Sequence, residues 1–422
     1  MPRKRWILTG AVVAVAALWA FWPRSTAMGN ARFFADQTYN FETIRVLTDT
    51  APVGGDLAEV TLAVAKIKTG DAQSWYAAWS EQGDRIAALA AKTKDATSRG
   101  DALLRAHTYY RAAEFFLDPH DPKRAAIWKK NLGAFYSGLD TLSVQYERIS
   151  VPYGPDHHLN AIYFPGGAGA EAKPLIVVVG GFDSTMEELY FHFVAAAHRR
   201  GFSVLIYEGP GQGSVLRDQG LTFIADWEKP NSAVLDTFLA SHPKPKKIVL
   251  MGESLGGYLA PRAAAFDARI DGVIAYDAMY NAGELAKRQV PHFVYWLRDH
   301  HYDGVLKLLA HRPQSPGSEW AAKNGMWTFG LSNPLAVLDA FQTLTLVPVA
   351  DRIHADVLLL AGADDHFTPN GEIDKVKAAL TQARSVTSVV FDHASGGGEH
   401  CQLGAPSLWH ATVFDWLAKT YN

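Results

Sequence analysis

The stretch Gly252-Glu253-Ser254-Leu255-Gly256 decides the fold, because it separates two segments of different character. Residues 248–251 before it are apolar and predict a short buried strand, and residues 258–266 after it predict a helix. A serine between glycines in this setting is typical of a tight turn that raises a nucleophilic hydroxyl above a sheet edge. The nearby helix N-terminus would favour negative charge developing there. The competing interpretation is an incidental glycine-rich helix start.

A serine hydroxyl needs a base, and the base needs an orienting carboxylate. After this kind of turn they follow in the order serine, acid, histidine. The apolar run 357–360 leads into a loop that carries Asp364 and Asp365. We predict Asp365 as the acid and keep Asp364, which we expect to cap the turn, as the alternative. His366 directly follows the acid and could not easily turn its ring onto it.

The predicted base is His400, which ends a glycine-rich segment after the last predicted strand. Gly396 to Gly398 would let this segment reach back over the sheet edge. His393 stands at the end of the strand and is the weaker alternative. We predict no metal site and no cofactor, because the other histidines lack metal-ligand spacing with carboxylates, including the pairs His157-His158 and His300-His301.

Negative charge on a substrate oxygen also needs hydrogen-bond donors. In this setting they come from the residue after the serine and from the loop after the third strand. We therefore predict the backbone N–H groups of Leu255 and of Phe182, the latter within Gly180-Gly181-Phe182. The glycine-rich segment 208–213 lacks the lysine and the spacing of a phosphate-binding loop, so we predict a structural turn there.

Apolar spacing divides the chain into two regions. Residues 31–140 show helical periodicity and predict a helical domain. Residues 141–422 alternate short β-branched runs with helices, which predicts an α/β domain whose mostly parallel sheet has helices on both faces. Residues 280–350, rich in aromatics, predict a helical insertion that could form part of a lid. Eight strands are expected, at 144–151, 159–164, 175–179, 203–207, 247–251, 272–276, 357–361 and 386–391.

The N-terminus has the pattern of an export signal. Three basic residues precede the uncharged apolar run 6–22, and small residues at 25–27 offer a cleavage site. Residues 1–27 are therefore predicted to be a signal peptide or a membrane anchor. The charge asymmetry places the body of the protein outside the cytoplasm, either periplasmic or membrane-anchored. The alternative is an apolar helix packed on a cytoplasmic protein.

Composition excludes several classes of protein. Hydrophobic residues make up 48% of the 422 residues and charged residues 20%, which indicates an ordered globular chain. The formal net charge of -3 does not favour nucleic acid as a partner. The single cysteine, Cys401, allows no intramolecular disulfide. We expect a small-molecule substrate as the main partner and a homodimer as one assembly to test.

Taken together, the motifs resemble the α/β-hydrolases that include bacterial dihydroxypseudooxynicotine hydrolase and fungal hydrolases that shorten polyketide pigment precursors. The resemblance implies an α/β-hydrolase fold with an N-terminal helical cap, a triad on Ser254, Asp365 and His400, and cleavage of carbon-carbon bonds beside a ketone or of esters. It covers nearly everything after the N-terminal segment. It rests on Gly70-Asp71, Ser74-Trp75-Tyr76, Trp79, Leu104-Arg105-Ala106, Tyr109-Tyr110-Arg111, Gly180-Gly181-Phe182-Asp183, segments 208–213 and 252–258, and Glu399-His400-Cys401.

We therefore expect a serine hydrolase that forms an acyl-enzyme on a small, largely apolar or aromatic carbonyl compound. Trp75, Tyr109 and Trp327 are candidate pocket walls, with core packing as the alternative for each. Glu284 and Asp277 are candidate auxiliary acids for protonating a leaving group, with solvated or capping roles as the alternative. The competing functions are a carboxylesterase or peptidase of the same fold and a non-enzymatic binding protein.

Overall fold

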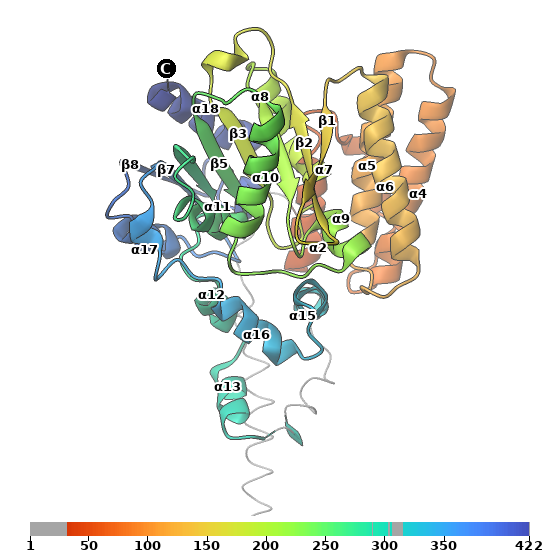
Figure 1. Cartoon of the computed structure of the whole chain (residues 1–422). Coiled ribbons are helices and arrows are strands. Elements are labelled where there is room, and N and C mark those ends of the chain that lie inside the picture. The colour runs from red at the N-terminus through yellow and green to blue at the C-terminus, as the bar shows by residue number, and fades with distance from the viewer. Residues whose placement is uncertain (1–31, 289, 303, 306–314, 422) are drawn as a thin grey trace, which may run out of the picture.

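An eight-stranded, mostly parallel sheet forms the centre of the computed structural model, which describes residues 32–288, 290–302, 304–305 and 315–421 (Figure 1). The strand order is β1-β2-β4-β3-β5-β6-β7-β8, and β2 pairs antiparallel with both β1 and β4. All eight predicted strands are present, with ends moved by three residues or fewer. They are β1 (Glu147–Pro152), β2 (His158–Phe164), β3 (Leu175–Val179), β4 (Val204–Glu208), β5 (Ile248–Glu253), β6 (Gly272–Tyr276), β7 (Asp356–Gly362) and β8 (Ser385–Phe391).

Burial follows the position of each strand in the sheet. Every residue of β3, β4, β5, β6 and β7 is buried, as their continuous apolar sequences predict for strands covered on both faces. The edge strands β1 and β8 are largely exposed or half-buried. The carboxyl ends of the parallel strands therefore rise from a rigid, dry interior.

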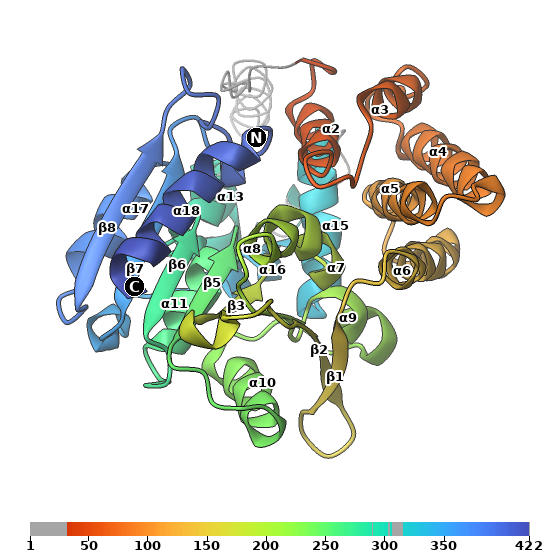
Figure 2. The same ribbon diagram turned by 90° about the horizontal axis from the view of Figure 1, so that it is seen from above.

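Helices cover both faces of the sheet (Figure 2). One face packs on α10 (Glu228–Ser241), α11 (Gly256–Ala264) and α17 (Gly371–Ala379). The opposite face packs on a helix interrupted by a π-helical turn and on the C-terminal helix. These elements are α7 (Met186–Leu189), η2 (Tyr190–Val194), α8 (Ala195–His198) and α18 (Pro406–Tyr421).

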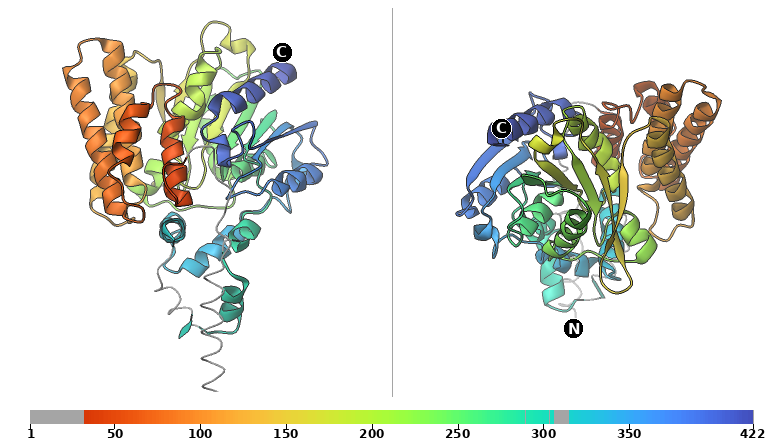
Figure 3. Two further views of the ribbon diagram at one scale, coloured as in Figure 1. Left: turned by 180° about the vertical axis from the view of Figure 1, so that it is seen from behind. Right: turned by 45° about the horizontal axis from the view of Figure 1, so that its top comes forward.

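The N-terminal helices stand beside the sheet and have a hydrophobic core of their own (Figure 3). They are α2 (Gln37–Thr48), α3 (Leu57–Val64), α4 (Ala72–Lys92), α5 (Ala96–Glu114) and α6 (Lys123–Thr141). An aspartate side chain accepts backbone N–H groups at the start of each of the first four. Helix α2 also contributes Phe41 and Ile44 to the core beneath the sheet, which brings this helix close to the carboxyl ends of the strands.

The segment between β6 and β7 is helical in the residues described, and its helices lie beyond one end of the sheet (Figures 1 and 3). They are α12 (Ala282–Arg288), α13 (His292–Asp299), α15 (Pro316–Phe329) and α16 (Pro334–Gln342). Shorter elements are α9 (Gly213–Gln219), η1 (Ala170–Ala172), η3 (Ala350–Arg352) and η4 (His400–Gln402).

The predicted signal peptide or anchor, residues 1–27, lies outside the described residues. Within the part of the chain that the structure describes, no helix combines the length and apolar character needed to cross a bilayer.

Candidate active site

Ser254 occupies the tight turn between β5 and α11. Its φ of 58° lies in the left-handed region, which a residue with a side chain adopts only where its surroundings enforce it. A Cβ atom at Gly252 would lie 1.9 Å from the carbonyl oxygen of Gly256, and one at Gly257 would lie 1.6 Å from that of Asp277. The turn therefore requires glycine at both positions, and it fixes the serine at the sheet edge.

His400 links Ser254 to Asp365. Its Nε2 lies 2.8 Å from the Ser254 Oγ, and its Nδ1 lies 2.7 Å from the Asp365 Oδ2. The other carboxylate oxygen of Asp365 accepts the backbone N–H groups of Phe367 and Thr368, both at 2.7 Å. The structure thus brings together the three side chains selected from the sequence, with the acid held from both sides.

Burial sets the electrostatics of this chain of hydrogen bonds. Desolvation raises the pKa of Asp365 to about 6, against the opposing effect of the neighbouring His400. Burial alone would lower the pKa of His400, but the carboxylates of Asp365 and Asp277 outweigh it and raise that pKa well above 6.5. The two carboxylates therefore stabilise the protonated imidazole.

The alternative acid and the alternative base pair with each other instead. His393 Nδ1 lies 2.9 Å from Asp364 Oδ2, at the protein surface. His366 Nδ1 lies 2.8 Å from Glu399 Oε1. None of these groups forms a hydrogen bond with Ser254 among the described residues.

The two predicted backbone donors lie beside the serine. A Cβ atom at Gly181 would lie 2.8 Å from the Cβ of Ser254 and 3.0 Å from the backbone nitrogen of Leu255, so the loop after β3 packs directly on the Ser254 turn. Among the hydrogen bonds of the described residues, neither Leu255 nor Phe182 donates its backbone N–H. Both N–H groups are therefore available to an oxygen atom bound above the serine.

Gln212 holds the donor loop in place, a role that the sequence did not reveal. Its Nε2 donates to the carbonyl oxygens of Gly180 and Gly181, both at 2.8 Å, and its side chain is buried. The Gly181 N–H in turn donates to the Ser184 Oγ at 3.0 Å. Segment 208–213 forms a turn between β4 and α9, and Gln212 within it is the residue that sequence reasoning missed.

The two candidate auxiliary acids differ in location. Glu284 has an exposed side chain and pairs with Lys287 at 2.9 Å, so it is placed as a solvated surface residue. Asp277 is fully buried at the end of β6, and its Oδ2 lies 3.2 Å from the Nδ1 of His400. It therefore lies behind the imidazole, on the side away from Ser254.

The three candidate pocket-wall residues also lie in different parts of the molecule. Trp75 and Tyr109 are fully buried in the core of the N-terminal helices. The Trp75 indole donates to the carbonyl oxygen of Ala112 at 2.6 Å, and the Tyr109 hydroxyl donates to Glu59 at 2.8 Å. Neither lines a pocket that the structure describes near Phe182, so the alternative of core packing describes both. Trp327, on α15, does line that pocket.

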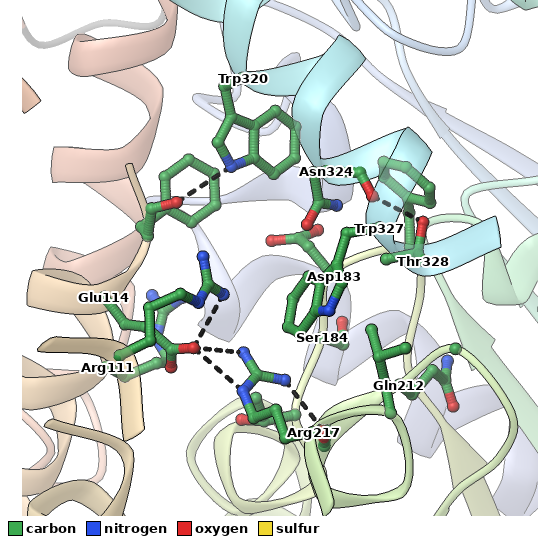
Figure 4. A pocket seen from close by; sticks show the side chains of 17 residues that line it. Arg111, Glu114, Asp183, Ser184, Gln212, Arg217, Trp320, Asn324, Trp327 and Thr328 are labelled. Carbon is green, nitrogen blue, oxygen red and sulfur yellow. Dashed lines mark hydrogen bonds and ion pairs between the residues drawn. The ribbon is translucent and has the colours of Figure 1, made fainter. Parts of the chain in front are cut away.

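That pocket lies between α5, α9, α15 and the loop after β3 (Figure 4). Glu114 points into it and accepts hydrogen bonds from Arg124 and Arg217, each at 2.8 Å. Both guanidinium groups also lie over the Trp327 ring, at 4.5 and 5.1 Å from its centroid. Phe182 lines this pocket and directly follows Gly181, which packs on the Ser254 turn. The other aromatic lining residues are Phe115 and Trp320.

Comparisons with known proteins agree with the fold. Hydrolase acrC of Aspergillus aculeatus is 30% identical over 93% of this chain and 98% of its own length. The 20-hydroxy-prefusarin hydrolase FUS2 of Gibberella moniliformis is 32% identical over 92% of this chain and 98% of its own. The crystal structure of 2,6-dihydroxy-pseudo-oxynicotine hydrolase superposes with a TM-score of 0.68 at 20% identity, covering 90% of this chain and 95% of that one, a similarity of fold.

The sequence resemblance is therefore confirmed at the level of the family. A model of the alpha/beta hydrolase family matches residues 175–409, which is more than half of the chain and includes every strand from β3 to β8. Together with the relatives that match along nearly the whole length, this match shows that the chain belongs to the alpha/beta hydrolase family.

Proposed function

We propose that this protein is a serine hydrolase that cleaves a small, largely apolar or aromatic carbonyl compound through an acyl-enzyme. One observation carries the proposal: an unbroken chain of hydrogen bonds joins Ser254, His400 and Asp365, beside the free backbone N–H groups of Leu255 and Phe182. A nucleophile, a base, an orienting acid and two oxyanion donors are the set that acyl transfer needs.

The first half-reaction forms the acyl-enzyme. The Ser254 Oγ attacks the substrate carbonyl carbon while the His400 Nε2 takes the hydroxyl proton. Negative charge moves to the carbonyl oxygen, where the N–H groups of Leu255 and Phe182 stabilise it. Asp365 keeps the imidazole oriented and stabilises its positive charge.

Collapse of the tetrahedral intermediate completes the first half-reaction, and its course depends on the leaving group. For a β-diketone, the bond between the attacked carbonyl carbon and the central carbon breaks, and its electron pair becomes an enolate that the imidazolium of His400 protonates. In the second half-reaction, water deprotonated by the same imidazole attacks the acyl group, and the imidazolium returns that proton to the Ser254 Oγ as the acid product leaves. An ester would follow the same course with an alkoxide as leaving group.

Aromatic side chains support an apolar or aromatic substrate. The Phe182 ring lies 5.3 Å from that of Phe341 and 6.2 Å from those of Phe223 and Trp320. On the other side, the Phe367 ring lies 5.0 Å from that of His400. The family resemblance implies carbon-carbon cleavage beside a ketone, and the relative FUS2 is named a 20-hydroxy-prefusarin hydrolase. We therefore place β-diketone-like compounds ahead of esters.

The proposal is tested first by labelling with a fluorophosphonate. Full-length protein should be labelled and Ser254→Ala should not, with circular dichroism showing that the variant stays folded. Turnover of a panel of β-diketones and aryl esters then ranks the substrate classes. Equal labelling of wild type and variant would remove Ser254 as the nucleophile. Aryl ester turnover without any diketone turnover would favour the carboxylesterase, and no labelling at all would favour a binding protein.

A further inference from the structure

Two buried carboxylates face the Nδ1 atom of His400. The Asp365 Oδ2 lies 2.7 Å away and the Asp277 Oδ2 lies 3.2 Å away, and neither side chain has exposed surface. They come from the ends of the paired parallel strands β7 and β6, whose register brings these ends side by side. Since an imidazole carries one Nδ1–H, both carboxylates can accept from the same donor.

Asp277 also connects the two loops that carry the reacting groups. Its Oδ2 accepts the backbone N–H of Cys401 at 2.7 Å, and its Oδ1 accepts the Gln402 Nε2 at 3.0 Å. Its backbone oxygen lies 1.6 Å from the position that a Cβ atom of Gly257 would take, against the Ser254 turn. Both carboxylate oxygens are thus engaged by the histidine loop, and the backbone is engaged by the serine turn.

The charges of the two acids are unequal. Burial disfavours both carboxylates, and two adjacent carboxylates do not both ionise freely in a dry site. Burial raises the pKa of Asp365 to about 6. Burial acts in the same direction on Asp277, but its contacts with His400 and with the Cys401 N–H outweigh it and hold the Asp277 pKa below its usual value. Asp277 is therefore the member of the pair that keeps its negative charge more firmly.

We propose that Asp277 is a second acid of this site, a positioning residue that shares the Nδ1–H of His400 with Asp365 and stabilises the imidazolium formed when Ser254 attacks. The inference rests on the proposed serine mechanism. It implies that loss of Asp365 is partly compensated from the neighbouring strand, which would not occur with a single acid.

A purely structural role is the alternative, since Asp277 also anchors the loop after His400. That role would change stability and leave the protonation of His400 untouched. Removing a negative neighbour should instead lower the pKa of His400. The pH limb of acylation, which is the pH range over which the labelling rate rises as His400 loses its proton, should then move to lower pH. The other titratable groups around the imidazole are Asp365, Cys401, Glu399 and His366.

The experiment measures the second-order rate of fluorophosphonate labelling in full-length protein. We expect Asp365→Asn to slow labelling by about 10- to 50-fold, Asp277→Asn by about 5- to 10-fold, and the double variant by about 10⁴-fold, the effect of losing the only acid of a triad. We also expect Asp277→Asn to move the pH limb to lower values. Gln402→Leu is the matched control, because it removes a loop contact of Asp277 and leaves the His400 contact, so its limb should not move.

Three results would overturn the proposal. The first is that Asp365→Asn labels as slowly as the double variant. The second is that Asp277→Asn labels at the wild-type rate with an unmoved limb. The third applies if Asp277→Asn does not fold, and it is a loss of about 10⁴-fold in Asp365→Asn alone, the effect of losing the only acid of a triad, in place of the expected 10- to 50-fold.

Failure of the proposed function would look different, because wild-type protein itself would then not be labelled. In that case the pKa of His400, followed by NMR in wild type and Asp277→Asn, decides alone. A lower pKa in the variant supports shared positioning, and an unchanged pKa overturns it.

Discussion

Two acid–histidine pairs stand at the same edge of the sheet and differ mainly in burial. Asp365 and His400 lie 2.7 Å apart with side chains 0% and 5% exposed, whereas Asp364 and His393 lie 2.9 Å apart with side chains 28% and 63% exposed. The acids are neighbours in sequence and the histidines come from one loop. Distance alone therefore does not distinguish the buried pair from the surface pair.

The two pairs differ in whether the histidine has a third hydrogen-bond partner and in the side chains that shield it from solvent. His400 contacts Ser254 through its second nitrogen, and the rings of Phe41 and Phe367 lie 6.1 and 5.0 Å from its ring. In a dry site the attraction between an acid and an imidazolium is several times stronger than at the surface, where water and salt weaken it. Burial thus converts an ordinary contact into one that can shift protonation.

The largest expected effect is on the buried histidine. His400→Gln should slow fluorophosphonate labelling by about 10⁴- to 10⁶-fold, because the serine then loses the group that accepts its proton. His393→Gln, the same substitution in the exposed pair, should stay within about twofold of wild type. Rates are compared at pH 8 after thermal melts confirm folding. Comparable losses in the two variants would erase the distinction between the pairs.

The same contrast should hold for ion pairs in the N-terminal helices. Arg45 is buried and binds Glu188 at 2.6 Å, with Asp183 also paired to it, whereas the exposed pair Lys66–Glu81 lies at 2.7 Å. Arg45→Met should cost about 3–5 kcal/mol of unfolding free energy, because it leaves buried carboxylates without their positively charged partner. Lys66→Met should stay within about 1 kcal/mol. Urea unfolding measures both, and similar costs would contradict the role of burial.

A smaller effect is expected from the amide that holds the donor loop. Gln212→Leu removes two hydrogen bonds to the loop before Phe182, so labelling should slow by about 10- to 100-fold while the nucleophile itself is intact. Gln219→Leu is the matched control, because that exposed amide bonds the backbone of His158, remote from the serine. Equal rates for the two variants would show that the loop does not need this support.

The sequence predicted the fold well because its evidence was local. Runs such as 175–179 and 272–276 are too short for helices and too apolar for loops, so their strand bounds came out unchanged. The order of Ser254, Asp365 and His400 along the chain follows from where three parallel strands end. The choice between Asp364 and Asp365 was harder, because both end the same strand and only packing buries one of them.

The remaining site residues depend on contacts that no local pattern encodes. Asp277 meets the backbone of Cys401 across 124 positions of sequence, and Gln212 meets the loop at Gly181 across 31. Trp75 and Tyr109 show the reverse problem, since large aromatics at helical spacing describe a core and a pocket wall equally well. Only the packing of α4 against α5 assigns both to the core.

The finest contrast between the buried and exposed pairs is the pH dependence. Because the pKa of His400 is raised well above 6.5, its contribution to stability is complete below about pH 6.5 and is lost as pH rises through the folded value. The pKa of Asp365 is raised from 3.8 to about 6, so the contribution of this residue to stability is likewise lost as pH rises through 6. Acylation moves the opposite way, because only the neutral imidazole accepts the serine proton, so labelling should fall about tenfold per pH unit below the pKa of His400. From pH 5.5 to 9.5, thermal melts should therefore show stability falling with pH while the labelling rate rises. The variant His393→Gln should behave as wild type. A labelling rate that is flat across this range would exclude His400 as the base.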